Sequence, residues 1–132
     1  MFIMVLKIIN ATEAKSGTHI LIEGEPYTIK KIDISKTGKH GHSKARIEAI
    51  GIINQQKKVF VVPGHERFEV PLVDKRKGQV LSKGDTISLM DLENFETIDV
   101  QCPDSSVKEQ LVEGENAEYW DIEGEKIVKR KL

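Results

Sequence analysis

The sequence divides its apolar residues into short runs separated by turn-forming residues, and this pattern favours an all-β fold. Valine, isoleucine and threonine are frequent in the runs, whereas glycine, proline and asparagine lie between them. In Ile47–Ile50 apolar and polar residues alternate, which is typical of a strand with one buried face. The first half holds five such runs, at Val5–Ile9, Thr18–Ile22, Tyr27–Ile34, Ala45–Ile53 and Lys58–Val62. Strands this short and this closely spaced predict a small, strongly bent antiparallel barrel.

A second series of short runs follows and predicts a second barrel. Its runs are Phe68–Asp74, Gln79–Leu81, Thr86–Asp91, Glu96–Cys102, Ala117–Ile122 and Lys126–Arg130. One short helix is expected at Ser106–Val112, because Ser106 and Glu109 have the spacing of a capping box. Five or six strands with one short helix before the last pair favour an OB-like barrel over a sandwich. Pro71 restricts the residue before it to extended geometry, so we expect the two domains to be residues 1–70 and 71–132.

The two halves differ in charge. Residues 1–70 carry 11 lysines and arginines against 7 acidic residues, a net charge of +4, whereas residues 71–132 carry 9 against 14, a net charge of -5. This asymmetry suggests that only the first half faces a polyanion. The second half also has few aromatic residues for stacking on nucleic acid. Tyr119 and Trp120 are neighbours on one predicted strand, so one is expected in the core and the other facing out.

Composition is that of a globular protein, with 39% hydrophobic and 31% charged residues. No apolar run approaches the roughly 18 residues that a membrane span needs, and the first residues lack the pattern of a secretory signal. Cys102 is the only cysteine, so an internal disulfide is impossible. We therefore expect a cytoplasmic protein, monomeric and without a membrane partner, that relies on packed sheets.

A basic loop lies between two of the predicted strands. No acidic residue occurs between Asp33 and Glu48. Gly38 and Gly41 flank Lys39 on either side, and glycine can adopt positive φ and leaves its neighbours accessible. No apolar residue could anchor the loop to a core, so Lys39 is expected at an exposed hairpin tip. The loop and the cations that follow it comprise Ser35, Lys36, Thr37, Gly38, Lys39, His40, Gly41, His42, Ser43, Lys44 and Arg46.

The residues alone leave several interpretations of this loop open. A lysine-rich hairpin tip is most often only solvated surface. His40 and His42 could share a metal, but a closed zinc site needs about four ligands and the loop offers no obvious others, so no metal site is predicted. A phosphate-binding P-loop is excluded, because His40 stands where that motif requires serine or threonine and no helix follows.

The segment Ser35–Lys44 resembles the modification loop of the translation initiation factor 5A family in its archaeal form. The similarity continues through Ala45–Gly51 and reaches into the second half at Lys77–Val80, Leu89–Glu93 and Glu118–Trp120, so that it covers nearly the whole chain. Ser43 departs from the alanine that family members often carry, and the lead-in Asp33-Ile34 differs from the eukaryotic form.

The resemblance implies an all-β fold with an N-terminal SH3-like barrel, followed by a C-terminal OB-fold barrel with one short helix. It also implies that Lys39 is the modified residue, to which deoxyhypusine synthase transfers the aminobutyl group of spermidine, giving deoxyhypusine or hypusine. The NAD of that reaction belongs to the synthase, and the chain itself is expected to need no cofactor. The expected partners are the synthase and the ribosome, with its rRNA and peptidyl-tRNA, where the family promotes peptide-bond formation at stalling sequences such as proline runs. The bacterial relative is elongation factor P.

Elementary chemistry also assigns Lys39 a passive role. A lysine in water has a pKa near ~10.4 and is a poor nucleophile, because attack on carbon needs the neutral amine that a desolvating pocket provides. Such a pocket must come from another protein, so Lys39 is expected to be a substrate and no catalytic residue is predicted. Ser35, Lys36, Thr37, Gly38, His40, Gly41, His42, Lys44 and Arg46 are the expected contacts to the modifying enzyme and to RNA. The alternative function is a general RNA-binding or chaperone-like module that uses the loop for phosphate contacts.

Overall fold

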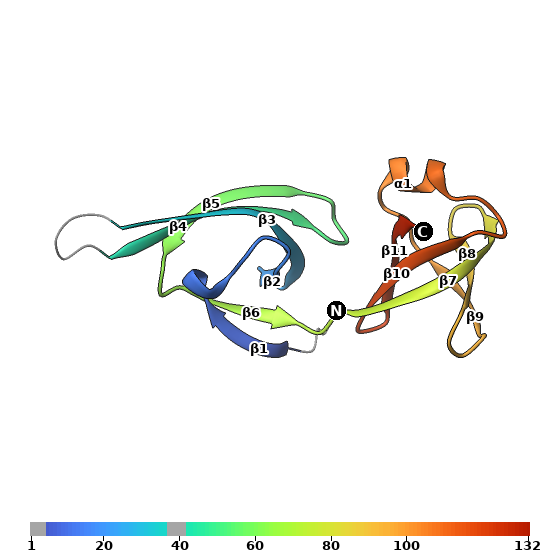
Figure 1. Cartoon of the computed structure of the whole chain (residues 1–132), viewed down its shortest axis with the longest axis horizontal. Helices are drawn as coiled ribbons and strands as arrows, with labels where there is room; N and C mark the ends of the chain where they lie inside the picture. The colour runs from blue at the N-terminus through green and yellow to red at the C-terminus, as the bar shows by residue number, and fades with distance from the viewer. Residues whose placement is uncertain (1–4, 37–41) are drawn as a thin grey trace. The chain divides into compact units, whose positions relative to one another are not determined.

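The computed structural model describes residues 5–36 and 42–132, which form two compact units, Met1–Leu72 and Val73–Leu132. Each unit is built from antiparallel strands around its own core (Figure 1). The predicted fold class is confirmed: the protein is all-β, with an SH3-like barrel followed by an OB-fold barrel that carries one short helix.

The first unit is a small barrel made from two sheets. A four-stranded sheet has the order β2-β3-β4-β5, and a two-stranded sheet pairs β1 with β6. A single 3-10 turn, η1, which the sequence pattern did not predict, follows β1. The elements are β1 (Val5–Asn10), η1 (Ala11–Glu13), β2 (His19–Ile22), β3 (Glu25–Lys36), β4 (Ser43–Gly51), β5 (Lys57–Pro63) and β6 (Arg67–Pro71).

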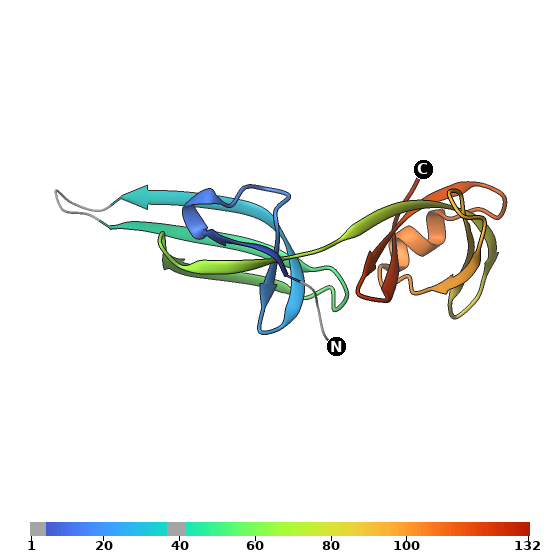
Figure 2. The same ribbon diagram turned by 90° about the horizontal axis from the view of Figure 1, so that it is seen from below.

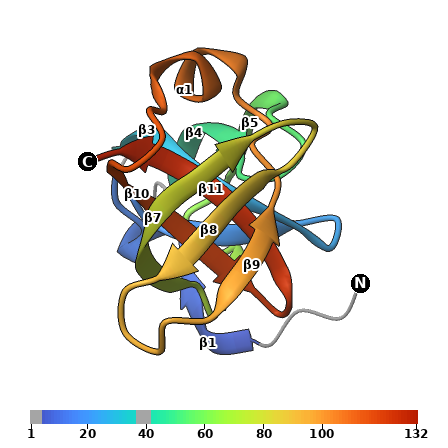
Figure 3. The same ribbon diagram turned by 90° about the vertical axis from the view of Figure 1, so that its right-hand side faces the viewer.

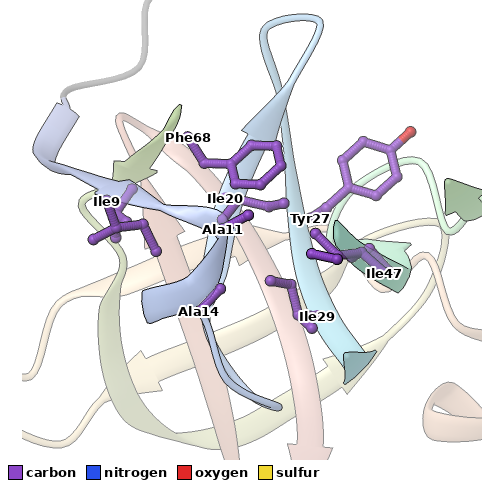
Figure 4. Close-up of a cluster of buried hydrophobic side chains, with 11 residues drawn as sticks. Ile9, Ala11, Ala14, Ile20, Tyr27, Ile29, Ile47 and Phe68 are labelled. Atoms are coloured by element: carbon purple, nitrogen blue, oxygen red, sulfur yellow. The ribbon is translucent and has the colours of Figure 1, made fainter. Parts of the chain in front are cut away.

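Alternation along the strands explains where the first core lies. On β4 the side chains of Ala45, Ile47 and Ala49 are completely buried, whereas the residues between them are exposed or half-buried. Side chains from β1, β2, β3, β4 and β6 gather in one apolar cluster between the sheets (Figure 4). Burial of this apolar surface holds the barrel together, because the described residues form no disulfide. The cluster comprises Ile9, Ala11, Ala14, Ile20, Tyr27, Ile29, Ala45, Ile47, Ala49, Phe68 and Val70.

The second unit is a five-stranded barrel with the strand order β11-β10-β7-β8-β9 (Figure 3). A parallel bridge between Gln101, just after β9, and Ile127 on β11 brings the first and last strands of this order together. The helix α1 connects β9 to β10. The elements are β7 (Asp74–Lys83), β8 (Ile87–Asp91), β9 (Thr97–Val100), α1 (Ser105–Gln110), β10 (Asn116–Ile122) and β11 (Glu125–Lys131).

Several predicted elements have different limits in the structure, and two of these differences have an identifiable cause. The run Phe68–Asp74 is not one strand of the second unit: β6 ends at Pro71 within the first unit, and β7 begins at Asp74. The helix begins at Ser105, because the carboxylate of Asp104 accepts the Ser106 amide at 3.0 Å and so caps the helix in place of Ser106.

The expectation that only one of Tyr119 and Trp120 is buried is wrong. Both side chains are buried, with 2% and 3% of their surface exposed. The register of β10 against β7 is unbroken, so Tyr119 and Trp120 point to opposite faces of the sheet, and of the two only Tyr119 belongs to the core cluster. The amine of Lys75 lies 4.6 Å from the Trp120 ring centroid and that of Lys129 lies 4.9 Å from it, so lysine side chains cover the indole.

Candidate functional site

The β3–β4 hairpin carries the segment that the sequence singles out. The two strands pair antiparallel over most of their length, as far as the partners Lys36 and Ser43. Figures 1 and 2 show both strands running past the other strands of their unit. From Asp33 to Lys36 every residue of β3 is exposed. The outer end of β3 is therefore held by its backbone hydrogen bonds to β4, and β4 in turn is anchored by its buried side chains.

The structure places five of the predicted site residues at this outer end. Ser35 and Lys36 end β3, His42 directly precedes β4, and Lys44 and Arg46 lie on β4; all five are exposed. Lys39, which the sequence predicts to be modified, and its neighbours Thr37, Gly38, His40 and Gly41 lie outside the described residues.

Alternation on β4 sends its cations to the outer face of the sheet. Ala45 and Ile47 are buried, so the side chains of Lys44 and Arg46 point the other way. Across the sheet, Arg46 lies opposite Asp33 on β3 and Val61 on β5. The fold therefore presents the basic residues on one surface beside β5.

The cations on this surface differ in how far they are neutralised. The Arg46 guanidinium lies 3.5 Å from the Glu48 carboxylate, which also receives Lys57 at 3.7 Å. Within the part of the chain that the structure describes, neither Lys36 nor Lys44 has a carboxylate within 4.0 Å. Lys36 and Lys44 are therefore available to pair with an external anion.

A close approach between the β5–β6 turn and Ser43 fixes the start of β4. The Gly64 amide donates to the carbonyl oxygen of Ser43 at 2.8 Å. A Cβ on Gly64 would lie 2.0 Å from Oγ of Ser43 and 2.8 Å from Cγ2 of Thr12, so only glycine fits here without a shift. Backbone contact at Gly64 thus ties the β5–β6 turn to the residue from which β4 starts.

A pocket of about 390 Å³ opens beside this contact. Its lining is mostly apolar and contains no carboxylate, in contrast to three other pockets of the described chain, which include Glu23, Glu66 or several aspartates. Sequence reasoning missed the β5 side of this pocket. No signal in the sequence gives this side, because it depends on the register of β4 against β5, which sets Pro63 opposite Lys44. The lining residues are His42, Ser43, Lys44, Val61, Val62, Pro63 and His65.

The second unit contains a buried charge cluster around Asp91. This carboxylate is 1% exposed and accepts from Arg76 Nε at 2.6 Å and Nη2 at 3.2 Å, from the Tyr119 hydroxyl, and from the amides of Glu93 and Asn94. The arginine hydrogen bonds hold the pKa of the Asp91 carboxyl well below its usual range. Burial, with the hydrogen bond to Asp91, raises the pKa of Tyr119 to about 12. Because every oxygen is satisfied from within the unit, this cluster stabilises the fold of the second unit.

The described residues contain neither a membrane-spanning helix nor a metal-binding cluster. Over residues 5–36 and 42–132, no helix is long and apolar enough to cross a membrane. Over the same residues, no three histidine, cysteine, aspartate or glutamate side chains are grouped so as to hold a metal ion.

Comparisons with known proteins point to one family. Residues 7–65 match the family described as translation initiation factor 5A-like, N-terminal. The chain is 42% identical to translation initiation factor 5A of Sulfurisphaera tokodaii over 120 residues, which is 89% of this chain and 92% of that protein. It is 41% identical to the factor of the same name from Thermococcus kodakarensis over 126 residues, 92% of this chain and 93% of that one.

Solved structures agree with the sequence comparisons. A eukaryotic translation initiation factor 5A from Methanococcus jannaschii superimposes with a TM-score of 0.80 at 39% identity, with 100% of both chains covered. A translation initiation factor eif-5a family protein from Naegleria fowleri gives a TM-score of 0.74 at 28% identity, covering 98% of this chain and 100% of that one.

Proposed function

Because the chain belongs to the translation initiation factor 5A family, as its relatives over nearly its whole length show, we propose that it works on the ribosome through a modified Lys39. The membership itself makes the protein a translation factor. The further step rests on one observation. The glycine-flanked lysine of the family's modification loop is present at Lys39, and it lies between two strands that pair outward to Lys36 and Ser43.

The proposal treats Lys39 as a substrate of deoxyhypusine synthase and the chain as a non-enzymatic factor. An ε-ammonium attacks carbon only after it loses a proton, and loss of the proton is favoured in a desolvated environment. Lys36 and His42, the nearest described residues on either side of Lys39, are both exposed, so they provide no such environment. The synthase would provide it, and would transfer the aminobutyl group of spermidine to the lysine nitrogen with the help of its own NAD.

The modification gives the side chain a second cationic nitrogen and greater length. A slender dication can enter a channel lined with phosphates, where each neutralised phosphate releases counterions and favours binding. We propose that the arm steadies the acceptor end of peptidyl-tRNA on the ribosome. Peptide-bond formation would then gain from better orientation of the reactants, while the chemistry stays with the ribosome. A factor of this kind works in the cytoplasm.

The cations next to the loop would hold it on RNA. Lys36 and Lys44 are exposed and have no carboxylate within ion-pair distance in the described chain, so each can contact a phosphate without losing a partner. Arg46 would first have to share its contact with Glu48. The same two lysines support the second candidate, a general RNA-binding module in which Lys39 is one phosphate contact among several.

A stalling reporter tests the proposal. Translation of a message that encodes a proline run is measured in a host or extract depleted of its own factor and supplied with deoxyhypusine synthase. The Lys39→Arg protein keeps the charge but cannot carry the aminobutyl arm, and it should fail to relieve the stall. The matched control is Lys15→Arg, the same conservative change at an exposed lysine of the first unit outside the hairpin, which should behave as wild type. Full rescue by Lys39→Arg would leave the RNA-binding module as the better interpretation.

A further inference from the structure

We propose that the pocket at the outer end of the β3–β4 hairpin binds one unstacked nucleotide of a single-stranded RNA. The pocket is formed by the start of β4, the end of β5 and the turn after β5, all within the first unit. The inference rests on the proposed ribosomal function only for the source of the RNA. The chemistry of the pocket is argued from its own residues.

The floor of the pocket suits a nucleobase. Val61, Val62 and Pro63 provide an apolar surface, and Val61 is 59% exposed in the absence of a ligand. His42 and His65, both exposed, add two imidazoles, and histidine is one of the side chains on which unstacked RNA bases stack.

The rim of the pocket suits a phosphate. Among the described residues of the lining, Lys44 is the one lysine, and none of them is a carboxylate. Arg46 lies two residues along β4 on the same face, where it pairs with Glu48 at 3.5 Å, so Lys44 is the cation that the pocket itself offers. An acidic peptide would also meet this charge. It would not need the two imidazoles, and an extended peptide would need a groove longer than this compact lining.

Size and shape restrict the ligand further. A volume of about 390 Å³ lies near the lower end of the roughly 300–1,000 Å³ that small-molecule sites occupy, which fits one nucleotide. A base within a duplex is stacked on both faces and cannot enter such a pocket. Loops, bulges and chain ends of RNA offer bases that can be splayed out, so the predicted ligand is a single-stranded segment next to the contacts of the hairpin.

The strand β5 provides a matched pair of test substitutions. Val61 lines the pocket and Val59 does not, yet both are exposed valines on β5, two residues apart and therefore on the same face. Val61→Asp and Val59→Asp add the same charge at comparable exposure. They also differ in the residue opposite, which is Arg46 for Val61 and Glu48 for Val59. A loss for Val61→Asp therefore counts for the pocket only if His65→Ala, which changes the lining without adding a carboxylate, shows a loss as well.

The experiment measures binding of a fluorescently labelled single-stranded RNA oligonucleotide to the full chain, expressed without deoxyhypusine synthase so that Lys39 is unmodified. Val61→Asp should weaken binding about tenfold, the scale of one lost stacked base, while Val59→Asp should change it by no more than about twofold. The same RNA annealed to its complement should bind more weakly than the single strand. Circular dichroism checks that each variant is folded, and His65→Ala, a change in an exposed turn, replaces Val61→Asp should that variant not fold.

Several results would overturn the inference. Equal losses for the two valine variants would mean that the effect is general repulsion, and duplex bound as tightly as single strand would exclude an unstacked base. Unchanged RNA binding by Val61→Asp, together with loss of modification by the synthase, would assign the pocket to a protein partner. This binding measurement uses unmodified protein, so it does not depend on the modification of Lys39. If Lys39→Arg were active in the stalling assay, the proposed function would fail, but the result for the pocket would still stand.

Discussion

The Gly64 amide donates to the Ser43 carbonyl at 2.8 Å, and this bond joins the turn after β5 to the first residue of β4. Ser43 is also the described partner of Lys36, the last residue of β3. One backbone contact therefore links the outer end of the described β3–β4 hairpin to the turn between β5 and β6. The absence of a side chain at Gly64 makes the contact possible, since a Cβ would collide with both Ser43 and Thr12.

Gly64→Ala should loosen the contact that holds Ser43 at the start of β4. The hydroxyl of Ser43 can rotate away, but Cγ2 of Thr12 at 2.8 Å and Cβ of Ser43 at 3.1 Å force the backbone to shift. We expect a loss of about 1–3 kcal/mol in the stability of the first unit, the usual cost of overpacking. Hydrogen exchange of peptides from β4, followed by mass spectrometry, should show faster exchange than in wild type.

The control for this change is Gly84→Ala. A Cβ at Gly84 would meet nothing closer than the Thr86 carbonyl oxygen at 3.7 Å, which is ordinary contact. Its exchange pattern should stay that of the wild type. Unaltered exchange of β4 in Gly64→Ala would show that the turn can move without cost and that Gly64 does not fix the hairpin.

Asp91→Asn should destabilise the second unit. The substitution leaves the Arg76 guanidinium without its buried counter-charge and sets amide hydrogens against the Tyr119 hydroxyl and Arg76. Breaking a buried ion pair costs about 3–5 kcal/mol, and Arg76 is partly exposed, so we expect about 3 kcal/mol. Trp120 is the only tryptophan and lies in this unit, so its fluorescence during urea unfolding measures the loss.

Asp74→Asn is the matched control on the same arginine. Asp74 is an exposed residue and accepts from Nη1 of Arg76 at 3.3 Å. An exposed pair contributes little, so the loss should stay below about 1 kcal/mol. Comparable losses in the two variants would contradict the special role given to Asp91.

The Asp91 variant also predicts an acid dependence. Arg76 hydrogen bonds lower the pKa of Asp91 in the folded state, so its stabilisation is complete above the unfolded carboxyl pKa of about 3.9 and is lost as the pH falls further. The stability difference between wild type and Asp91→Asn should therefore be constant near neutral pH and shrink below about pH 4. A difference that stays the same down to strongly acid pH would mean that the charge of Asp91 is not what stabilises the unit.

Tyr119→Phe should change the alkaline behaviour of the second unit. Burial and the bond to Asp91 raise the pKa of Tyr119 to about 12 from an ordinary value of 10.0. The unfolded state therefore releases this proton first, and stability falls as the pH rises through this interval. The phenylalanine variant should lack this part of the decline, while losing about 1–2 kcal/mol at neutral pH because Asp91 loses a donor. Parallel alkaline curves for the two proteins, followed by Trp120 fluorescence, would count against this reading of Tyr119.

Much of the fold could be predicted because the strands are short and their turns are marked. The pattern located β4 from its alternating buried residues Ala45, Ile47 and Ala49, with limits that differ by two residues at each end. It failed in two places. Asp104 and Ser106 both suit a helix cap, and only the structure shows that the Asp104 carboxylate accepts the Ser106 amide. Trp120 points away from the core cluster, as alternation requires, yet it is buried, with the amines of Lys75 and Lys129 over its ring.

Part of the candidate site could likewise be predicted from the sequence, and part could not. Lys36, Lys44 and Arg46 could be named from the basic run between Asp33 and Glu48, and the structure places all three on exposed positions beside one another in the hairpin. The pocket could not be foreseen, since it depends on the register between β4 and β5 and on the approach of the Gly64 turn. Those contacts join residues far apart in the sequence.

The most direct test of the central claim is the mass of the Lys39 peptide from protein purified out of its native host. We expect this peptide to carry the added mass of one aminobutyl group, with or without one oxygen, and peptides with the other lysines of the chain to carry none. An unmodified Lys39 peptide, in protein that is active in the stalling assay, would contradict the claim that the protein works through a modified Lys39.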